Sequence, residues 1–238
     1  MLFNSIEFVF FFVIVLAIIT IYKNKNFQHF FLLIASCFFL YFSNNYLIGL
    51  LIFSIILDFY VGKMIWQTSS KQKKKILLII SLVGNLGLLG FFKYADFAIM
   101  QFNIMGNYFD LTNDIPLLDL ILPIGISFYT FQTITYTVDI YRGKLTPSKS
   151  LKEFALFVSF FPQLVAGPIV RASEFLPQLR EKLEKINGVS KLKQIRIHPN
   201  NLKLGITLMT FGFFKKMFFA DNIAPLVNNV FADPIGLD

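Results

Sequence analysis

The feature of this sequence that most constrains its fold is a series of apolar runs, each close to 20 residues long. A helix of that length crosses the hydrocarbon core of a bilayer. The chain has 238 residues, of which 55% are hydrophobic and 31 are Phe, and its mean hydropathy is +0.64. A soluble chain of this length can bury one core, but it cannot hide six or seven such runs. The pattern predicts an all-α integral membrane protein with about six to seven transmembrane or re-entrant helices.

The basic residues indicate how the chain is oriented. The formal net charge is +8, and the charges lie in short gaps between apolar runs, which is typical of cytoplasmic loops and argues against a nucleic-acid partner. Nineteen of the 22 Lys and Arg residues fall in segments that one topology places inside. The first span, Ile6–Tyr22, has no basic residue before it and is followed by Lys23 and Lys25. This order is the reverse of a secretory signal peptide. We therefore predict an uncleaved anchor with its N-terminus outside.

The apolar runs and the segments between them give a provisional map of the chain. We expect segment 93–118 to lie outside and to include an interfacial amphipathic piece, and segment 171–203 to be a cytoplasmic amphipathic segment. Basic segments 67–75 and 142–152 are expected to be inner loops. The expected spans and apolar runs are Ile6–Tyr22, Phe30–Ser43, Tyr46–Trp66, Ile76–Phe92, Leu120–Tyr141 and Leu204–Ala220.

Phe154–Arg171 starts as an apolar run and then contains residues that disfavour a continuous helix. Pro162 and Pro168 lack backbone donors, Gly167 permits unusual backbone angles, and Gln163 is polar. Non-helical backbone at membrane depth is tolerated only where protein or a wet cavity surrounds it. One interpretation is a broken or re-entrant element around which other helices pack. The other is a proline-kinked helix with a structural role only.

Several polar residues interrupt the apolar runs at helical spacing. Ser54, Asp58 and Gly62 share one helix face, so Asp58 either faces the bundle interior and finds a partner or is solvated near the inner interface. Gly84, Gly87 and Gly90 recur every third residue, a spacing that allows close approach of another helix.

The run Leu120–Tyr141 carries a polar stripe at positions Gln132, Thr135, Tyr136 and Asp139, which predicts contact with helices or a cavity instead of lipid. Asp139 is also spaced to pair with Arg142 across one helical turn. Pro123 and Gly125 are expected to weaken the start of this run.

The remaining ionisable residues give weaker indications. Cys37 is the single cysteine, so no intrachain disulfide and no metal cluster are predicted. His29, at the cytoplasmic edge of its apolar run, and His198, in the cytoplasmic segment, are each expected to be solvated. Lys215 and Lys216 lie inside an apolar run, where they must reach the interface or meet anions.

Four collinear stretches together resemble one family. They are MLFNSIEF at the start, LPIGISFYTFQTITYTVDIYRG, FVSFFPQLVAGPIVR and GFFKKMFFADNIAP. They resemble the membrane-bound O-acyltransferases, in the bacterial branch typified by the alginate O-acetyltransferase membrane subunit, and the resemblance covers almost the whole chain.

The resemblance implies transfer of an acetyl or acyl group from a cytoplasmic thioester, acetyl-CoA or a similar donor, to an extracytoplasmic polysaccharide such as alginate. It implies no bound cofactor, a location in the bacterial inner membrane, contact with membrane lipid, and a partner acetyltransferase outside. The acceptor, the acyl group, the partner's identity and the oligomeric state stay open.

One departure from the family pattern is large. The family's hallmark histidine lies in a later apolar region, and neither His29 nor His198 has that context. We therefore assign no catalytic residue, expect residues 1–238 to be the N-terminal part of a single domain with a partial fold, and expect this part to be inactive alone. Whether such a truncation is natural stays open. By motif position, the candidate funnel-lining or structural residues are Asp139, Arg142, Gln163, Gly167, Pro168, Arg171, Lys215 and Lys216.

Two alternatives come from other classes of protein. Polar stripes and broken helices also mark substrate pathways in transporters and channels, although the two halves of this chain show no convincing inverted repeat. A chain of this kind could also act as a non-catalytic scaffold for a partner acetyltransferase.

Overall fold

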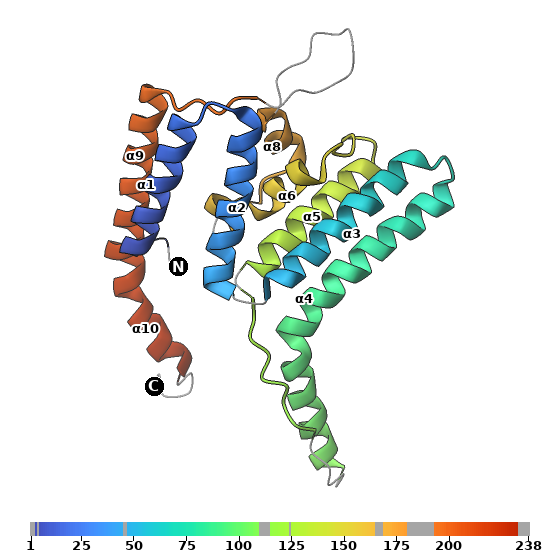
Figure 1. Ribbon diagram of the computed structural model, residues 1–238. Helices are drawn as coiled ribbons and strands as arrows, with labels where there is room; N and C mark the ends of the chain where they lie inside the picture. The colour runs from blue at the N-terminus through green and yellow to red at the C-terminus, as the bar shows by residue number, and fades with distance from the viewer. Residues whose placement is uncertain are drawn as a thin grey trace. The chain divides into compact units, whose positions relative to one another are not determined.

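The computed structural model describes residues 3, 5–44, 47–109, 115–123, 125–164, 169–179 and 193–232. Every regular element within these ranges is a helix (Figure 1), in agreement with the predicted all-α class. The helices fall into two compact units. One contains the helices between Tyr22 and Gln194, and the other contains the first helix of the chain together with the helices after Ile195.

Three helices form the centre of the first unit. Helices α3 (Ile48–Gln67), α4 (Lys71–Tyr108) and α5 (Ile126–Tyr141) pack against one another in pairs. Helix α6 (Leu151–Ser159) packs against α3, α5 and α2 (Lys25–Asn44). The short helix α7 (Phe161–Leu164) contacts α2, and α8 (Ala172–Leu179) contacts α5 and α6. Tyr136 and Phe154 meet in this core with ring centroids 4.3 Å apart.

Among the described residues, two helices are long and apolar enough to cross a membrane by length and composition. They are α3 and α4, which correspond to the expected spans Tyr46–Trp66 and Ile76–Phe92. Helix α1 (Ile6–Ile21) matches the expected first span but has only 16 residues. At 1.5 Å per residue it extends about 24 Å, somewhat less than the hydrocarbon thickness of about 30 Å.

Helix α4 corrects two expectations about its surroundings. Lys71–Lys75 form its first turn instead of part of a loop, with the Ser70 hydroxyl accepting the Lys73 N–H at 3.4 Å. The helix then continues past Lys93 to Tyr108, where a separate outer segment was expected. Its 38 residues extend about 57 Å, nearly twice the hydrocarbon thickness. No proline lies between Lys71 and Tyr108, so nothing in the sequence forces the helix to end at Phe92.

Residues 115–123 return along the last part of α4 without forming a helix (Figure 1). Polar side chains of α4 bond to their backbone. Asn103 donates to the carbonyl of Ile115 at 2.8 Å and accepts the N–H of the same residue at 3.0 Å. The carboxylate of Asp96 accepts the N–H groups of Leu118 at 2.7 Å and Leu120 at 3.3 Å. Asp96 and Asn103 therefore supply hydrogen-bond partners for backbone groups of this segment, which forms no helix of its own.

Helix α5 begins at Ile126, six residues after the expected start of the span at Leu120. The sequence correctly identified the cause. Gly125 precedes the helix with φ of +84°, in the left-handed region that other residues disfavour. A Cβ atom at this position would lie 2.9 Å from the carbonyl oxygen of Leu164, so the close approach of α7 also requires glycine.

The expected break in Phe154–Arg171 is present and lies at Phe160. Helix α6 ends at Ser159, Phe160 has φ of −55° and ψ of 107°, and α7 begins at Phe161. Pro162 is in the first turn of α7, where a missing N–H removes no helical hydrogen bond. The element is therefore a broken helix and not one continuous helix kinked by proline. Gly167 and Pro168 lie outside the described residues.

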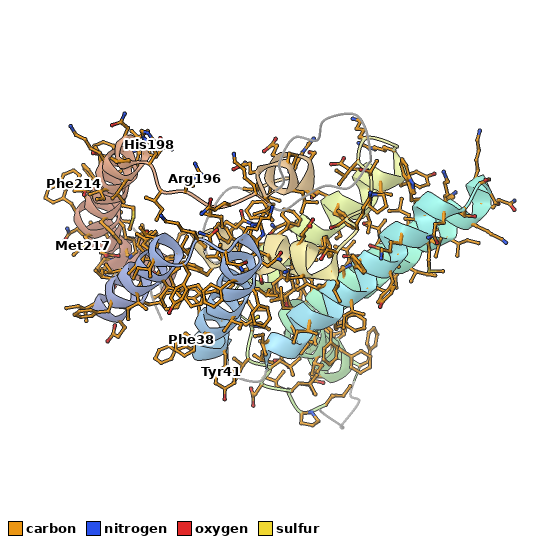
Figure 2. All side chains as sticks on the ribbon, turned by 45° about the horizontal axis from the view of Figure 1, so that its top comes forward. Phe38, Tyr41, Arg196, His198, Phe214 and Met217 are labelled. Carbon is orange, nitrogen blue, oxygen red and sulfur yellow. The ribbon has the colours of Figure 1, made fainter. Side chains whose placement is uncertain are left out.

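Large apolar side chains cover much of the outer surface of the helices. Figure 2 shows Phe38 and Tyr41 on α2, which are 51% and 59% exposed. In the other unit it shows Phe214 and Met217, which are 50% and 58% exposed. Arg196 and His198, also labelled there, precede α9 in sequence. Helices with this much exposed apolar surface match a lipid environment, because soluble monomers rarely expose large contiguous apolar patches.

The second unit contains α1 and a nearly continuous helical run. Helix α9 (Pro199–Phe214) is followed by the π-helical segment η2 (Lys215–Ala220) and by α10 (Asp221–Ala232). Two expectations are corrected here. The helix starts five residues before Leu204, because Pro199 is well suited to the first turn, and it continues beyond Ala220. Residues 193–198, in the segment expected to be amphipathic, are not helical.

Candidate functional site

A cluster of buried polar side chains joins the three central helices of the first unit. Asp58 on α3 is fully buried. One of its carboxyl oxygens accepts the hydroxyl of Ser81 at 2.6 Å, and the other accepts the amide of Asn85 at 2.8 Å. Ser81 and Asn85 are one helical turn apart on α4 and are both buried. The prediction that Asp58 faces the interior and finds a partner is confirmed, and its solvated alternative is wrong.

The cluster extends to α5 through two threonines. Thr137 Oγ1 lies 3.1 Å from the hydroxyl oxygen of Ser81, and Thr133 Oγ1 lies 3.4 Å from the amide oxygen of Asn85. Each threonine hydroxyl also lies within 3.0 Å of a backbone carbonyl one turn earlier. The side chains of α3, α4 and α5 therefore bond to one another, which fixes the register of the three helices. The sequence analysis identified Asp58 but missed Ser81 and Asn85, whose spacing on α4 was a usable signal.

Gly62 and Tyr136 make the closest contact between α3 and α5. A Cβ atom at Gly62 would lie 2.9 Å from both the Tyr136 ring and the Ile140 side chain. The absence of a side chain therefore lets the fully buried Tyr136 ring lie against α3. Its hydroxyl oxygen accepts the N–H of Ser148 at 2.9 Å, which holds the loop between α5 and α6 against the core. Of Gly84, Gly87 and Gly90 on α4, only Gly84 is closely approached, by Leu57.

This loop forms one wall of a cavity of about 390 Å³. Its other wall is the last turn and a half of α3. The lining includes two lysines, the single tryptophan and two hydroxyl side chains. Its residues are Lys63, Trp66, Gln67, Thr146, Pro147, Ser148 and Lys149. The ammonium of Lys63 lies 4.2 Å from the centroid of the Phe59 ring. Ammonium groups suit the phosphates of a ligand, and the exposed indole ring of Trp66 offers a face on which a planar ring can stack. The sequence analysis did not select these residues.

Gln163 has a partner that explains its place in the broken element. Its amide donates to the carbonyl of Phe157 at 2.9 Å, and Gln132 on α5 donates to the same oxygen at 2.9 Å. This carbonyl is in the last turn of α6, where the helix end removes its usual donor. The N–H of Phe161, which would serve it in a longer helix, donates instead to the Ser36 hydroxyl at 3.3 Å. Two glutamines from different motifs thus cap the broken helix.

Asp139 and Arg142 are adjacent at the end of α5 but do not form an ion pair in the described structure. Asp139 is nearly buried and Arg142 is exposed. The backbone carbonyl of Asp139 accepts the N–H groups of Lys144 at 2.9 Å and Leu145 at 3.3 Å, which ends the helix in a turn. The pair that their spacing allows is therefore not formed, since the Asp139 side chain is buried in the core while the Arg142 side chain is exposed.

The other candidate residues are spread over both units. Arg171 is exposed just before α8, and its carbonyl accepts the N–H groups of Glu174 and Phe175 in the first turn of that helix. Lys215 and Lys216 are in η2 of the second unit. Lys216 pairs with Asp221, and the Lys215 ammonium lies 4.7 Å from the Phe211 ring centroid. The structure therefore brings Gln132 and Gln163 together within the first unit, whereas Lys215 and Lys216 belong to the second unit.

His29 corrects the expectation of a solvated interfacial residue. It is 1% exposed, and its Nε2 atom lies 3.0 Å from the carbonyl oxygen of Lys193. Its Nδ1 atom is buried and has no hydrogen-bond partner. His29 therefore lies inside the first unit, beside the segment that follows α8 in the described chain. No group of three His, Cys, Asp or Glu side chains suited to a metal ion occurs among the residues that the structure describes.

Comparison with known proteins identifies the family of the chain. Residues 145–234 match the profile described as "MBOAT, membrane-bound O-acyltransferase family". The chain is also 36% identical over 227 residues to the "Peptidoglycan O-acetyltransferase" of Helicobacter pylori, a match that covers 85% of this chain and 40% of the relative. The chain belongs to the membrane-bound O-acyltransferase family.

Other members of this family match nearly the whole chain. The "Probable alginate O-acetylase AlgI" of Pseudomonas aeruginosa is 32% identical over 236 residues, covering 98% of this chain and 42% of the relative. The protein of the same name from Azotobacter vinelandii is 30% identical over 233 residues, covering 98% of this chain and 44% of the relative. The chain therefore spans about two fifths of the length of the curated relatives that it matches. No solved structure matches it.

Proposed function

We propose that this chain is part of an O-acyltransferase that moves an acetyl or acyl group from a cytoplasmic thioester to an extracytoplasmic polysaccharide. The observation that carries the proposal is the similarity over 85% to 98% of the chain to proteins named as O-acetylases. The broken helix and the buried polar cluster support it, because an acyltransferase embedded in lipid needs non-lipid surroundings for polar substrates.

The acceptor that we propose first is an alginate-like polysaccharide, since two of the relatives described above are named as alginate O-acetylases. Peptidoglycan is the second candidate, because a peptidoglycan O-acetyltransferase is 36% identical to this chain. Both acceptors offer sugar hydroxyl groups. A partner acetyltransferase outside the membrane is part of the proposal for either one.

We propose that the donor, acetyl-CoA or a similar acyl thioester, binds through its nucleotide at the cavity between α3 and the α5–α6 loop. Lys63 and Lys149 line this cavity beside Trp66. Phosphate groups favour the ammonium groups, and a nucleotide base favours stacking on the indole ring. The hydrogen bond from Ser148 to Tyr136 ties the cavity wall to the same helix that carries Gln132.

The proposed topology has the N-terminus outside, about six to seven spans in the inner membrane, and the donor cavity on the cytoplasmic side. Single-cysteine variants test it in a Cys37→Ala background. Ser69→Cys is next to the basic start of α4 and should resist an impermeant thiol reagent in intact cells, whereas Asn113→Cys should react. Reaction at Ser69→Cys and not at Asn113→Cys would show that the orientation is inverted.

The roles of the motif residues are tested in the complete protein. Gln163→Ala removes a cap of α6, and Arg171→Ala removes an exposed cation from the same motif. If either side chain binds substrate, O-acetyl content falls while expression stays normal. Normal acetylation at normal expression would assign both residues a structural role.

We propose that the present chain alone does not catalyse transfer.

Deletion of the gene in its own bacterium tests the function itself. We expect the O-acetyl content of one extracytoplasmic polysaccharide to fall and to return when the gene is restored. Acetyl groups are released with alkali and quantified for the purified polysaccharide and for peptidoglycan separately. Unchanged acetylation of both would contradict the proposal, and ion or polysaccharide flux in liposomes would favour a transporter instead. Capture of an active partner acetyltransferase by a protein that itself contributes no activity would favour a scaffold.

A further inference from the structure

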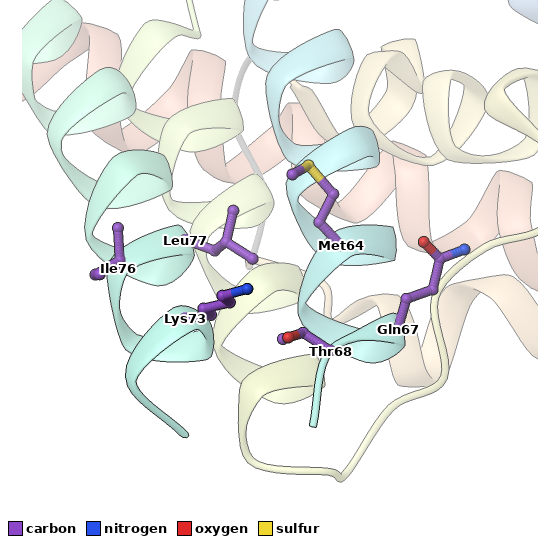
Figure 3. A pocket seen from close by; sticks show the side chains of 6 residues that line it. All are labelled: Met64, Gln67, Thr68, Lys73, Ile76 and Leu77. Atoms are coloured by element: carbon purple, nitrogen blue, oxygen red, sulfur yellow. The ribbon is translucent and has the colours of Figure 1, made fainter. Parts of the chain in front are cut away.

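A second cavity lies between the end of α3 and the start of α4. It has a volume of about 420 Å³ and is lined by Met64, Gln67, Thr68, Lys73, Ile76 and Leu77. Figure 3 shows Met64 and Thr68 on the α3 side and Lys73, Ile76 and Leu77 on the first turns of α4. Gln67 is the one residue that it shares with the proposed donor cavity. The two cavities therefore lie on either side of the last turn of α3.

The lining divides into two chemically different parts. Lys73, Thr68 and Gln67 supply an ammonium, a hydroxyl and an amide at one end. Met64, Ile76 and Leu77 supply an apolar wall, and Met64 and Ile76 remain 51% and 57% exposed. The apolar wall continues along α4 as exposed Ile79, Ile80 and Val83. A ligand that fills this cavity needs a polar head and an apolar chain that follows the helix.

The charge around the cavity has one sign. Lys71, Lys74 and Lys75 adjoin Lys73 on the first turn of α4. No Asp or Glu occurs between Phe59 and Ala95, and none lines the cavity. The N-terminal end of a helix carries a partial positive charge, and like charges three or four residues apart repel one another. These lysines are therefore unfavourable for the helix itself and favourable for an anion.

We propose that this cavity binds an anionic phospholipid. The phosphate lies at Lys73 and Thr68, and one acyl chain follows Met64, Ile76 and Leu77. A free phosphate ion would satisfy the charge but leave the apolar wall uncovered. The two helices that form the cavity are also the two described helices long and apolar enough to cross a membrane. Their apolar side chains beside the cavity are exposed, as contact with an acyl chain requires. The basic residues next to it attract anionic lipids in the same way as juxtamembrane lysines do.

Lipid binding to the purified chain in detergent tests the proposal by native mass spectrometry. Phosphatidylglycerol and phosphatidylcholine with identical acyl chains are titrated separately, and Lys73→Gln is compared with Lys93→Gln. Lys93 is on the same helix, more than five turns after Lys73, and is also exposed, so it is a matched control. We expect phosphatidylglycerol to bind more tightly than phosphatidylcholine. Lys73→Gln should weaken phosphatidylglycerol binding about fivefold, the effect expected of one basic residue at an anionic membrane surface.

Further measurements separate the lipid from other anions. Met64→Gln should weaken binding of both lipids, because it acts on the apolar wall. Inorganic phosphate and coenzyme A at millimolar concentration should not displace phosphatidylglycerol. Equal affinity for the two lipids, equal losses in Lys73→Gln and Lys93→Gln, or displacement by phosphate would overturn the proposal. Displacement by coenzyme A that depends on Lys73 would also overturn it and would assign the cavity to the donor. Far-ultraviolet circular dichroism verifies that each variant is folded.

Discussion

The hydrogen bonds of Asp58 lead to a quantitative prediction about the stability of the three central helices. Asp58→Ala removes the acceptor for the Ser81 hydroxyl and for one hydrogen of the Asn85 amide. Side-chain hydrogen bonds between membrane helices average about 0.6 kcal/mol, with a maximum of about 1.7 kcal/mol. Each buried partner left unsatisfied adds about 1–3 kcal/mol. Asn85 keeps its bond to the Ser81 carbonyl at 2.9 Å, and the Ser81 hydroxyl keeps Thr137 Oγ1 at 3.1 Å, so both penalties are partial. We expect Asp58→Ala to lower the free energy of unfolding by about 2–4 kcal/mol.

A double-mutant cycle shows whether this loss arises from the bond to Asn85. Once Asp58 is absent, Asn85→Ala should have a smaller effect than it has in the wild-type chain. The expected coupling energy between the two positions is about 0.5–2 kcal/mol. Ser54→Ala, one turn before Asp58 and also buried, should show a coupling to Asn85→Ala close to zero.

The assay is unfolding of the purified chain in mixed micelles with increasing dodecyl sulfate, followed by circular dichroism. Asp58→Asn provides an intermediate case, because its side-chain oxygen can still accept from Asn85 while its amide can donate to the Ser81 oxygen. Asp58→Asn should lower the free energy of unfolding by about 1 kcal/mol. A coupling energy of zero between Asp58 and Asn85, or an Asp58→Ala variant as stable as the wild type, would refute the reasoning.

Three further predictions concern other contacts. Gln163→Leu should lower the free energy of unfolding by only about 1 kcal/mol, because Gln132 still donates to the Phe157 carbonyl. Replacing both glutamines should destabilise the chain by more than the sum of the two single replacements, as measured by melting in detergent, and strict additivity would contradict shared capping. Gly62→Leu should lower the melting temperature more than Gly49→Leu on the same helix, because a Cβ meets Tyr136 and Ile140 at Gly62 and no atom within 4 Å at Gly49, and overpacking costs about 1–3 kcal/mol; equal effects would be inconsistent with the close contact. The exchange Lys216→Asp with Asp221→Lys should restore most of the stability lost in either single variant, and failure of this rescue would indicate that the two side chains do not interact.

The sequence predicted the features that depend on local periodicity. Ser54, Asp58 and Gly62 were placed on one face from their spacing, and the structure buries all three. Gln132, Tyr136 and Asp139 on the polar stripe of α5 are also buried. Gly125 delays the start of α5 because of its backbone angle. Each of these features follows from properties of neighbouring residues.

Features that depend on partners outside the spacing of a regular α-helix were not predicted. Lys216 was recognised as an ionisable residue in an apolar run, but its partner was not, since residues five apart do not share a face in a regular α-helix. The wider π-helical turn brings Asp221 to it. Similarly, nothing local indicates that Gln132 and Gln163 reach the same carbonyl, or that His29 meets the Lys193 backbone.

The length of α4 shows a different limit. Lys93 was interpreted as the end of a span because a charge at that point suits the membrane interface. The backbone, however, contains no proline there and continues as a helix to Tyr108. Hydropathy predicts which residues are suited to lipid, whereas helix ends depend on capping and on residues that cannot continue the helix.

The central claim is transfer of an acyl group across the membrane by the protein to which this chain belongs. The most direct test uses sealed vesicles of known orientation that contain the complete protein and its extracytoplasmic partner, with radiolabelled acetyl-CoA on one side and the polysaccharide on the other. We predict labelled polysaccharide when the donor is on the cytoplasmic side and none when it is on the opposite side. Equal labelling from both sides, or labelling that does not depend on the protein, would contradict the claim.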